Sequence, residues 1–378
     1  MSSSVRKTRV LVVDDSVVAR RLLTEVLGED PDIEVIGAAA TAQIALAKLR
    51  QVRPDVIVLD VEMPEMSGLE LIPHIRKAQP EARIIMFSSV TARGAESTLD
   101  ALALGASDYV TKPAGTTGLT ESRLRIKNEL CSKIKALHRP IGASSIEIVP
   151  VAQVRPLVVP ARSASILPGR TDILAIGSST GGPNALAEVL AAIDESFPVP
   201  VVVVQHMPPV FTRLLAERLA TRVGGRACEA KDGDVLRAGR IYVAPGDHHL
   251  MTMREGKDVV CRLGQSAPEN FCRPAVDALF RSVVPAYGAN VLAVVLTGMG
   301  QDGFRGCQDI KAAGGTVIAQ DKATSVVWGM PGAVAKAGLA DEVLPLGQIG
   351  ARLVSRTAGQ RTGVRGAPVA RVKDAHGS

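Results

Sequence analysis

Short runs of aliphatic and β-branched residues recur along two stretches of this chain, and helical periodicity fills most of the intervals between them. The runs are Val10–Val13, Ile33–Gly37, Val56–Leu59, Ile84–Phe87 and Tyr109–Thr111, then Ile173–Ile176, Val201–Val204 and Val291–Leu296. Continuous apolar strands alternating with helices are typical of parallel sheets that helices cover on both faces. We therefore expect two α/β domains, each built on a mostly parallel, doubly wound sheet. Short strand-like pieces over about Cys228–Arg262 predict a hairpin insert in the second domain.

The 378 residues divide by character into four segments. We expect a first domain over 1–115, a linker over 116–170, a second domain over 171–355 and a disordered basic tail over 356–378. The linker holds a possible helix near Arg123–His138 and then becomes rich in Pro, Ser and Val; after Pro345 the helical periodicity fades.

Charge is distributed unevenly over these segments. The two domains carry net charges of −3 and −1, whereas the linker carries +6 and the tail +4, so the whole chain has +6. Aromatic residues make up only 3% of the chain, too few for a surface that stacks bases. We therefore expect no nucleic-acid partner.

The cysteines and the apolar runs indicate a cellular compartment. Five cysteines form no C-x-x-C pair and leave an odd count, which favours reduced thiols. Residues 1–9 are polar and lead into a short apolar run, unlike a signal peptide, and no run approaches the length of a membrane span. We expect a cytoplasmic, monomeric protein without membrane insertion.

Polar residues follow the strands of the first domain where ligands gather in open parallel sheets. Asp14 and Asp15 follow the first strand, Asp60 the third, Ser88 the fourth and Lys112 the fifth. Converging carboxylates repel one another unless a hard cation such as Mg²⁺ neutralises them, and a lysine with a hydroxyl suits a phosphoryl group. Each residue alone would suit a helix cap, a turn or a solvated charge, but the ordered set favours a site.

The motifs VLVVDDS, VIVLDVEMPEMSGLE, IIMFSS and GASDYVTKP resemble the response-regulator receiver domain, over residues 8–115. The resemblance implies a flavodoxin-like fold with Asp60 as phospho-acceptor. It further implies Mg²⁺ held by Asp14, Asp15, Asp60 and the backbone carbonyl of Glu62. In the same family pattern Ser88 and Lys112 contact the phosphoryl group and Tyr109 is the switch aromatic.

A serine, a histidine and an aspartate follow strands of the second domain. Gly177–Gly182 (GSSTGG) joins a strand to a helix, His206 follows Val201–Val204, and Asp302 follows Val291–Leu296. A serine needs a base and an orienting carboxylate to act as a nucleophile, and parallel strands bring all three to one edge. A phosphate-binding loop is the alternative, although the Walker lysine and G-x-G-x-x-G spacing are missing, and a strand-end histidine can be a turn residue. Cys228 and Cys307 are weaker nucleophile candidates because neither lies at a strand-to-helix turn.

The motifs IGSSTGG, QHMPPVFTRLLAERL, YVAPGDHH, RPAVDALFRSV and LTGMGQDG resemble the catalytic domain of chemotaxis protein-glutamate methylesterases, the CheB family, over about 171–350. The resemblance implies a Rossmann-like domain without a cofactor, with Ser179 as nucleophile, His206 as base, Asp302 as its orienting acid and the Met299 N–H as an oxyanion donor. The family commonly has Gly-Ala-Ser-Thr where this chain has Gly177-Ser178-Ser179-Thr180, so Ser178 is the other serine to consider.

The two resemblances together imply a phosphorylation-activated hydrolase of chemotaxis. It would demethylate glutamate methyl esters on chemoreceptors, releasing methanol, and deamidate receptor glutamines. Its partners would be a chemotaxis-type histidine kinase as phosphodonor and methylated chemoreceptors as substrate. The alternatives are a methylesterase-like regulator of a non-chemotactic pathway, and a receiver-bearing DNA-binding or interaction protein that has lost catalysis. No helix-turn-helix follows the linker, which disfavours DNA binding.

Overall fold

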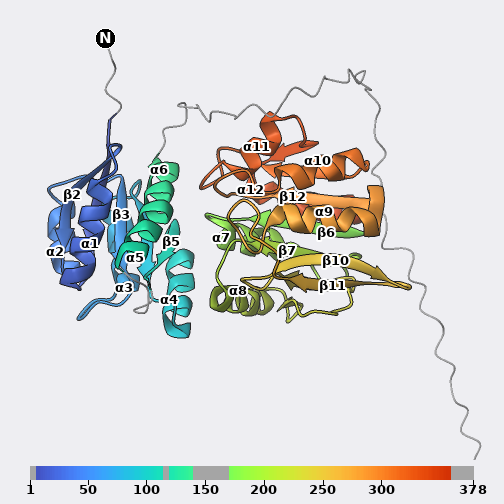
Figure 1. Ribbon diagram of the computed structural model, residues 1–378, viewed down its shortest axis with the longest axis horizontal. Helices are drawn as coiled ribbons and strands as arrows, with labels where there is room; N and C mark the ends of the chain where they lie inside the picture. The colour runs from blue at the N-terminus through green and yellow to red at the C-terminus, as the bar shows by residue number, and fades with distance from the viewer. Residues whose placement is uncertain (1–5, 114–118, 139–169, 359–378) are drawn as a thin grey trace, which may run out of the picture.

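The structure is a computed structural model that describes residues 6–113, 119–138 and 170–358 (Figure 1). The Pro- and Ser-rich part of the predicted linker at 139–169 lies outside these described residues, and so does most of the disordered tail predicted over 356–378, namely 359–378. The prediction was wrong for the start of that tail, because Arg356 and Thr357 belong to a helix in which Thr357 is buried. None of the helices in the described ranges is both long and apolar enough to cross a membrane.

The first unit is built on five parallel strands in the order β2-β1-β3-β4-β5. The strands are β1 (Thr8–Val13), β2 (Ile33–Ala39), β3 (Val56–Asp60), β4 (Arg83–Ser88) and β5 (Asp108–Thr111). The helices between them are α1 (Val17–Gly28), α2 (Ala42–Leu49), α3 (Gly68–Ala78) and α4 (Ala92–Ala103). The predicted flavodoxin-like, doubly wound sheet is confirmed, with every predicted strand present.

Alternating strand residues build two cores in this unit. Leu11, Ile57 and Met86 face α2, α3 and α4, while Val10, Val58 and Ile85 face α1 and the segment after β5. That segment comprises α5 (Leu119–Ile126), the π-helical turn η1 (Lys127–Cys131) and α6 (Ser132–His138). It is the first half of the predicted linker, and it packs on the first sheet through apolar residues such as Leu130 and Ile134.

The second unit is built on seven parallel strands in the order β14-β13-β12-β6-β7-β9-β8. The strands are β6 (Ile173–Ser178), β7 (Val201–Gln205), β8 (Ala227–Glu229), β9 (Ile241–Val243), β12 (Val291–Val295), β13 (Thr316–Gln320) and β14 (Glu342–Leu344). The predicted hairpin insert is present as β10 (His249–Glu255) with β11 (Asp258–Gly264). The earlier strand-like pieces of that region, β8 and β9, are not part of the hairpin and instead extend the main sheet. Each is three residues long; β9 pairs in parallel with β7, and β8 pairs in parallel with β9.

Helices cover both faces of the second sheet. One face carries α7 (Gly182–Ala191), α8 (Pro209–Arg222) and α12 (Leu346–Thr357), and the other carries α9 (Val276–Tyr287), α10 (Phe304–Ala312) and α11 (Met330–Lys336), with the 3₁₀ turn η2 (Gly288–Asn290) leading into β12. The fading periodicity after Pro345 therefore did not reveal α12, which buries Ile349 and Leu353 beside α7.

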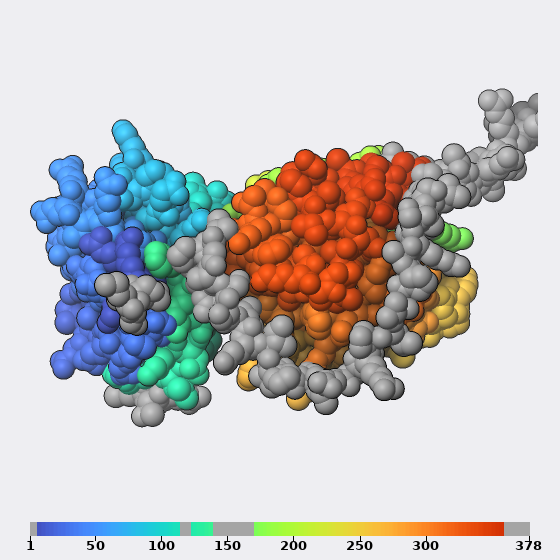
Figure 2. All heavy atoms as spheres, turned by 90° about the horizontal axis from the view of Figure 1, so that it is seen from above, coloured from blue at the N-terminus to red at the C-terminus, as the bar shows by residue number. Residues whose placement is uncertain are grey.

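The two units lie side by side, as Figure 1 and the space-filling view of Figure 2 both show. Helix α4 of the first unit packs against α7 and α8 of the second. Asn184 donates to the carbonyl of Leu102 at 2.7 Å, and Arg218 pairs with Asp100. This contact brings the α4–β5 side of the first unit against the carboxyl ends of strands β6 and β7.

Candidate functional sites

Two adjacent serines lie at the end of β6, and burial distinguishes them. Ser178 is fully buried, and its hydroxyl donates to Oε1 of Gln205 at 2.7 Å. Ser179 is partly exposed in the turn before α7, and within the described residues its hydroxyl makes no hydrogen bond. The turn is tight, since a Cβ at Gly182 would lie 1.9 Å from Oε1 of Gln205. Ser179 is thus the serine that a substrate can reach.

His206 follows β7 directly and is held on its backbone and its ring. Its N–H donates to the carbonyl of Ser178 at 3.2 Å, which ties it to the serine turn. Its Nε2 lies 2.8 Å from Oδ2 of Asp302. The structure therefore brings together the histidine, the aspartate and the serine turn from three different strand ends, as the sequence predicted for a parallel sheet.

Asp302 is buried and receives several hydrogen bonds besides that of His206. Its Oδ2 accepts from the N–H of Val276 at 2.6 Å, and its Oδ1 accepts from the N–H of Asp277 at 3.0 Å. These N–H groups open α9, where a helix has unpaired donors and favours negative charge. Asn270 adds a third kind of donor, with its amide 2.8 Å from Oδ1 of Asp302 and 2.9 Å from Oδ2 of Asp277. The carboxylate is therefore fixed before any substrate binds.

The electrostatics of the pair favour a charged histidine. Burial lowers the pKa of His206, but the hydrogen bond with Asp302 and the contact with Cys272 raise it more, to about 10. Burial raises the pKa of Asp302. The hydrogen bond and charge of His206, together with the N–H groups of the helix, lower this pKa by more, so the net value lies below the usual one. The contacts with Asp302 and Cys272 therefore favour the protonated ring of His206, and burial opposes it.

Cys272 is a neighbour of His206 that the sequence did not reveal. Its Sγ lies 3.4 Å from Nδ1 of His206, so both ring nitrogens have partners other than the serine. Neither Cys228 nor Cys307, the cysteines considered from the sequence, makes such a contact; Cys307 is fully buried in the core beside α9. Cys272 comes from the loop before α9, which has no strand end to mark it.

The loop after β12 passes directly over Ser179. A Cβ at Gly298 would lie 2.9 Å from the Cβ of Ser179, so only glycine allows this approach. The next residue, Met299, has a backbone N–H with no acceptor among the described residues, while its side chain packs against an apolar cluster that joins residues of the first unit to Val327 of the second. A free N–H beside a nucleophile is the kind of donor that an oxyanion hole requires.

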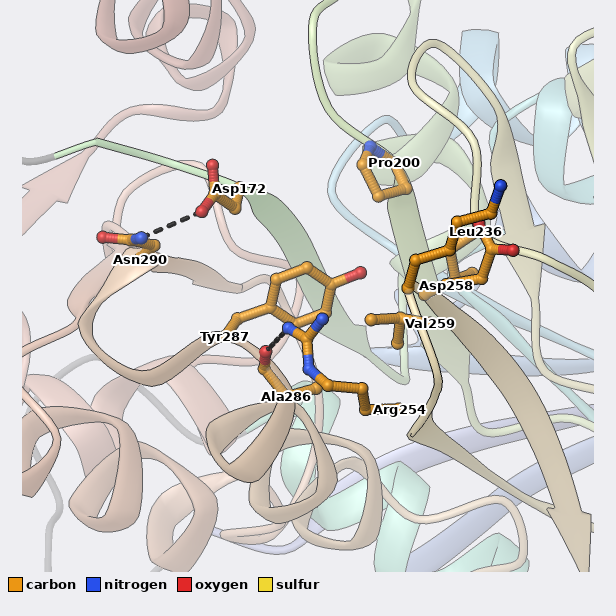
Figure 3. Close-up of a pocket in the computed structure, with 10 residues that line it drawn as sticks. Asp172, Pro200, Leu236, Arg254, Asp258, Val259, Ala286, Tyr287 and Asn290 are labelled. Atoms are coloured by element: carbon orange, nitrogen blue, oxygen red, sulfur yellow. Dashed lines mark hydrogen bonds between the residues drawn. The ribbon is translucent and has the colours of Figure 1, made fainter.

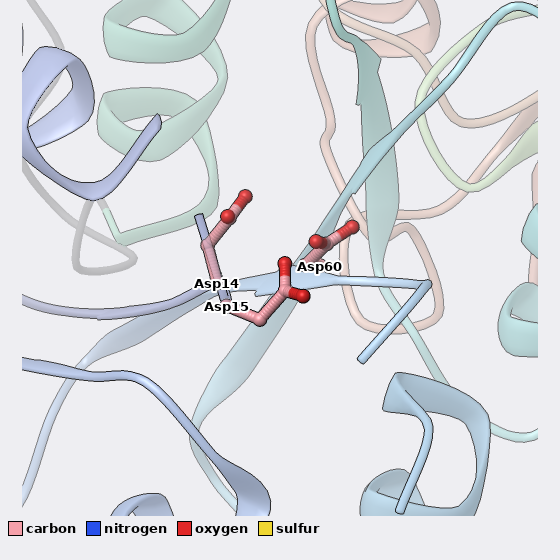
Figure 4. A group of neighbouring side chains, drawn as sticks. All are labelled: Asp14, Asp15 and Asp60. Carbon is pink, nitrogen blue, oxygen red and sulfur yellow. The ribbon is translucent and has the colours of Figure 1, made fainter. Parts of the chain in front are cut away.

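The three predicted aspartates of the first unit converge at the carboxyl ends of β1 and β3 (Figure 4). One carboxylate oxygen from each of Asp14, Asp15 and Asp60 lies within 4.8 Å of the others. Oδ2 of Asp14 is buried without a hydrogen-bond donor; its charged neighbour is Nζ of Lys112 at 3.2 Å. An unpaired buried carboxylate oxygen in an all-oxygen cluster fits a hard divalent cation such as Mg²⁺.

Lys112 lies within this cluster, where its ammonium group contacts both Asp14 and Asp60. Lys112 Nζ lies 2.8 Å from Oδ2 of Asp60. Burial raises the pKa of Asp60, Lys112 lowers it and Asp14 raises it again, to about 6 overall. The backbone N–H of Glu62 donates to Oδ1 of Asp60 at 3.2 Å. Ser88 lies at the end of β4, but its hydroxyl donates to the carbonyl of Gly94 at 3.0 Å rather than facing the aspartates.

Tyr109 is buried between the two units. Its ring stacks on Phe211 of α8, with centroids 4.6 Å apart and planes 9° from parallel. The neighbouring Asp108 accepts from the hydroxyl of Thr180 at 2.7 Å and pairs with Lys133 at 3.2 Å. Thr180 follows Ser179 directly, so the first unit touches the residue beside the candidate nucleophile.

A separate pocket of about 370 Å³ opens at the other edge of the second sheet (Figure 3). Asp172, Pro200 and Asn290 line it, and they precede β6, β7 and β12 respectively. The pocket therefore lies at the amino ends of the strands, on the edge opposite Ser179 and His206.

Comparison with known proteins identifies both units. A family model described as CheB methylesterase matches residues 174–353, and one described as response regulator receiver domain matches residues 10–123. The protein-glutamate methylesterase/protein-glutamine glutaminase of Trichodesmium erythraeum is 49% identical, over 93% of this chain and 99% of that protein. The protein of the same name from a Nocardioides species is 50% identical, over 93% and 96%. The crystal structure of the Thermotoga maritima CheB methylesterase catalytic domain is similar to 49% of this chain and 98% of that chain, with 45% identity and a TM-score of 0.48.

Proposed function

The chain belongs to the CheB family of protein-glutamate methylesterases that carry a receiver domain, and on that premise we propose which of its residues perform and control the hydrolysis. The enzyme is a methylesterase and glutaminase of chemotaxis regulated by phosphorylation. In our proposal Ser179 is the nucleophile, His206 the base and Asp302 the residue that orients and charges the base.

The first half of the reaction forms an acyl-enzyme. The neutral ring of His206 takes the hydroxyl proton of Ser179 while Oγ attacks the ester carbonyl of the modified glutamate. Because Nε2 of His206 is in contact with Asp302, Nδ1 is the nitrogen that takes this proton. Nδ1 must first lose its contact with Sγ of Cys272. The Met299 N–H stabilises the oxyanion of the tetrahedral intermediate. His206 then returns the proton to the departing methoxide, and methanol leaves.

The second half releases the product. Water gives a proton to His206 and attacks the acyl carbon. His206 passes this proton to Oγ of Ser179 as the bond between Oγ and the acyl carbon breaks, and the glutamic acid that is released loses its own proton to solvent. With a glutamine side chain the same sequence expels ammonia in place of methanol.

Phosphorylation of Asp60 controls access to this site. Lys112 would balance the charge of the phosphoryl group, and Ser88 would exchange its hydrogen bond to Gly94 for one to that group. Asp14, Asp15 and Asp60, with the carbonyl of Glu62, would hold Mg²⁺, which when bound offsets the negative charge gathered there. Tyr109 stacks on Phe211 in the unphosphorylated protein and would lose this partner when the receiver moves away.

The partners follow from the same proposal. A histidine kinase of the chemotaxis type would supply the phosphoryl group, and methylated chemoreceptors would be the substrate. The observation that carries the proposal is the contact of 2.8 Å between His206 and Asp302, next to the turn of Ser179. Among the described residues, the hydroxyl of Ser179 has no hydrogen-bond partner.

The test is methanol release from methylated receptor by the full chain, with and without acetyl phosphate. We expect Ser179→Ala to reduce release by at least about 1000-fold, as for other serine nucleophiles. Ser178→Ala is the matched control and should retain most of the activity, since Ser178 only hydrogen-bonds Gln205. Full activity in Ser179→Ala, or its loss only in Ser178→Ala, would refute the assignment. Equal rates with and without acetyl phosphate would refute the control by Asp60.

A further inference from the structure

Phe271 is a fully exposed aromatic residue in the loop between β11 and α9. Its relative exposure is 103%, and it is the one aromatic side chain among the large exposed hydrophobic residues of the described ranges. Phe is ordinarily among the most buried residue types, so a phenyl ring held wholly in solvent calls for a physical reason.

The backbone at Phe271 is unfavourable for its side chain. Glu269 and Cys272 exchange two backbone hydrogen bonds, of 3.1 and 2.8 Å, around Asn270 and Phe271. Both central residues have positive φ, 51° for Asn270 and 64° for Phe271, as in a type I′ turn. Asn suits the first of these positions, whereas the second strongly favours glycine. Phe271 therefore occupies a position where glycine would cause less backbone strain.

Both ends of this turn are attached to the catalytic residues. Asn270 donates to the carboxylate of Asp302, and Sγ of Cys272 lies 3.4 Å from Nδ1 of His206. Phe271, between them, projects from the rim of the active site into solvent. A polypeptide whose glutamate side chain reaches His206 would come close to this turn, because the two residues that flank Phe271 contact Asp302 and His206.

The charged side chains around the turn already have partners. Glu269 pairs with Arg281 at 2.6 Å, and Nε of Arg273 lies 3.0 Å from Asp247. The ring of Phe271 supplies the apolar part of the surface that is exposed at the turn. Aromatic rings supply large contact areas at low cost in conformational entropy and are enriched among residues that dominate binding.

We propose that Phe271 is a substrate-docking residue, which packs against an apolar side chain of the receptor segment that carries the esterified glutamate. The inference rests on the proposed function, because it takes the receptor as the polypeptide that enters this site. Phe271 would determine how well the receptor binds and would leave the proton transfers to Ser179 and His206.

The experiment is steady-state methanol release from methylated receptor by the full chain activated with acetyl phosphate. Phe271→Gly should raise KM about tenfold, the usual effect of truncating a dominant contact, and leave kcat within about twofold. The same substitution should raise the temperature of thermal unfolding, because glycine adopts a φ of 64° without steric strain. Phe271→Tyr should keep the wild-type KM. Met253→Ala is the matched control, an exposed hydrophobic residue in the hairpin, and should leave both constants unchanged.

Phe271→Asn, which also tolerates positive φ, repeats the test should Phe271→Gly lower the unfolding temperature. An unchanged KM in the folded variant, or a loss of kcat at constant KM, would overturn the docking role. Failure of the proposed function is distinguishable, since it would appear as the absence of methanol release by the wild type, or as full release by Ser179→Ala.

Discussion

At the scale of single residues, the behaviour of His206 depends on what contacts each of its ring nitrogens. Asp302 at Nε2 is a buried carboxylate fixed by the start of α9, whereas Cys272 at Nδ1 comes from an irregular loop. Both contacts raise the pKa of His206, to about 10, against the lowering effect of burial. A base must be neutral to accept a proton, so both contacts oppose the form of His206 that acts as a base, while burial favours that form.

Removing the thiol should make the base available at lower pH. In Cys272→Ala the pKa of His206 should fall, because one of the two contacts that raise it is lost. The acid limb of the profile of kcat/KM against pH should then move toward lower pH. For each unit of that shift, activity on the acid side should rise about tenfold.

The measurement is kcat/KM for methanol release from about pH 6 to about pH 11 with the full chain and acetyl phosphate, a range that brackets the pKa of about 10. Cys228→Ala, a partly buried cysteine in β8 without a contact to His206, is the control. An acid limb that stays in place in Cys272→Ala would contradict the influence of the thiol on the base.

At the scale of elements, α12 shows where sequence periodicity falls short. Its sequence LGQIGARLVSRT contains two glycines, which weaken the helical signal. One of them, Gly350, has a packing role, since a Cβ there would lie 2.7 Å from the Cβ of Ala192 at the end of α7. The close approach of the two helices lets Ile349 and Leu353 become fully buried. Tertiary packing therefore stabilises a helix that local propensity only weakly favours.

Truncating the buried face of α12 should destabilise the catalytic unit. Leu353 is fully buried in the core shared with α7, so Leu353→Ala should reduce the free energy of unfolding by about 2–5 kcal/mol. Urea unfolding can be followed by the fluorescence of Trp328, the chain's one tryptophan, which lies in this unit. Ser355→Ala, on the exposed face of the same helix, should change the value by less than about 0.5 kcal/mol. Equal stability of the two variants would mean that α12 does not pack on α7 in solution.

At the scale of the whole molecule, the receiver is joined to the catalytic unit by a few specific contacts near the nucleophile. Asp108 bonds Thr180, and Tyr109 stacks on Phe211. Thr180 follows Ser179 directly in the chain. In our proposal, a receiver held in this position restricts the approach of a large polypeptide substrate while His206 and Asp302 stay in contact.

Weakening the stacked pair should activate the enzyme without phosphorylation. Phe211→Leu keeps an apolar side chain in α8 but removes the ring that stacks on Tyr109. Aromatic pairs contribute about 0.5–1.5 kcal/mol, so the undocked population and the rate without acetyl phosphate should rise by about twofold to tenfold. The rate with acetyl phosphate should stay close to that of the wild type. The ratio of the rate with acetyl phosphate to the rate without it should therefore fall.

Phe197→Leu is the matched control, because Phe197 is equally buried in the catalytic unit without stacking on the receiver. It should leave the ratio of the two rates unchanged. A similar ratio in Phe211→Leu and the wild type would show that the stacked pair does not hold the receiver in place.

The sequence by itself determined the two parallel sheets and the residues that follow their strands. Asp14, Asp60 and Lys112 in one unit, and His206, Asp302 and a serine of the GSSTGG turn in the other, could be predicted because parallel strands carry their carboxyl ends to a common edge. That rule requires only the positions of the apolar runs, which are local features of the chain. The choice of Ser179 over Ser178 came from the resemblance to the methylesterase family.

The tertiary structure alone decided which serine is accessible, what surrounds His206 and how the units meet. Ser178 and Ser179 are identical in chemistry and differ only in the side of the turn they face. Cys272, Asn270 and Phe271 lie in a loop without periodicity, and the contact of Asp108 with Thr180 joins residues 72 positions apart. Such contacts depend on how folded elements pack against one another, and no local pattern of side chains records that geometry.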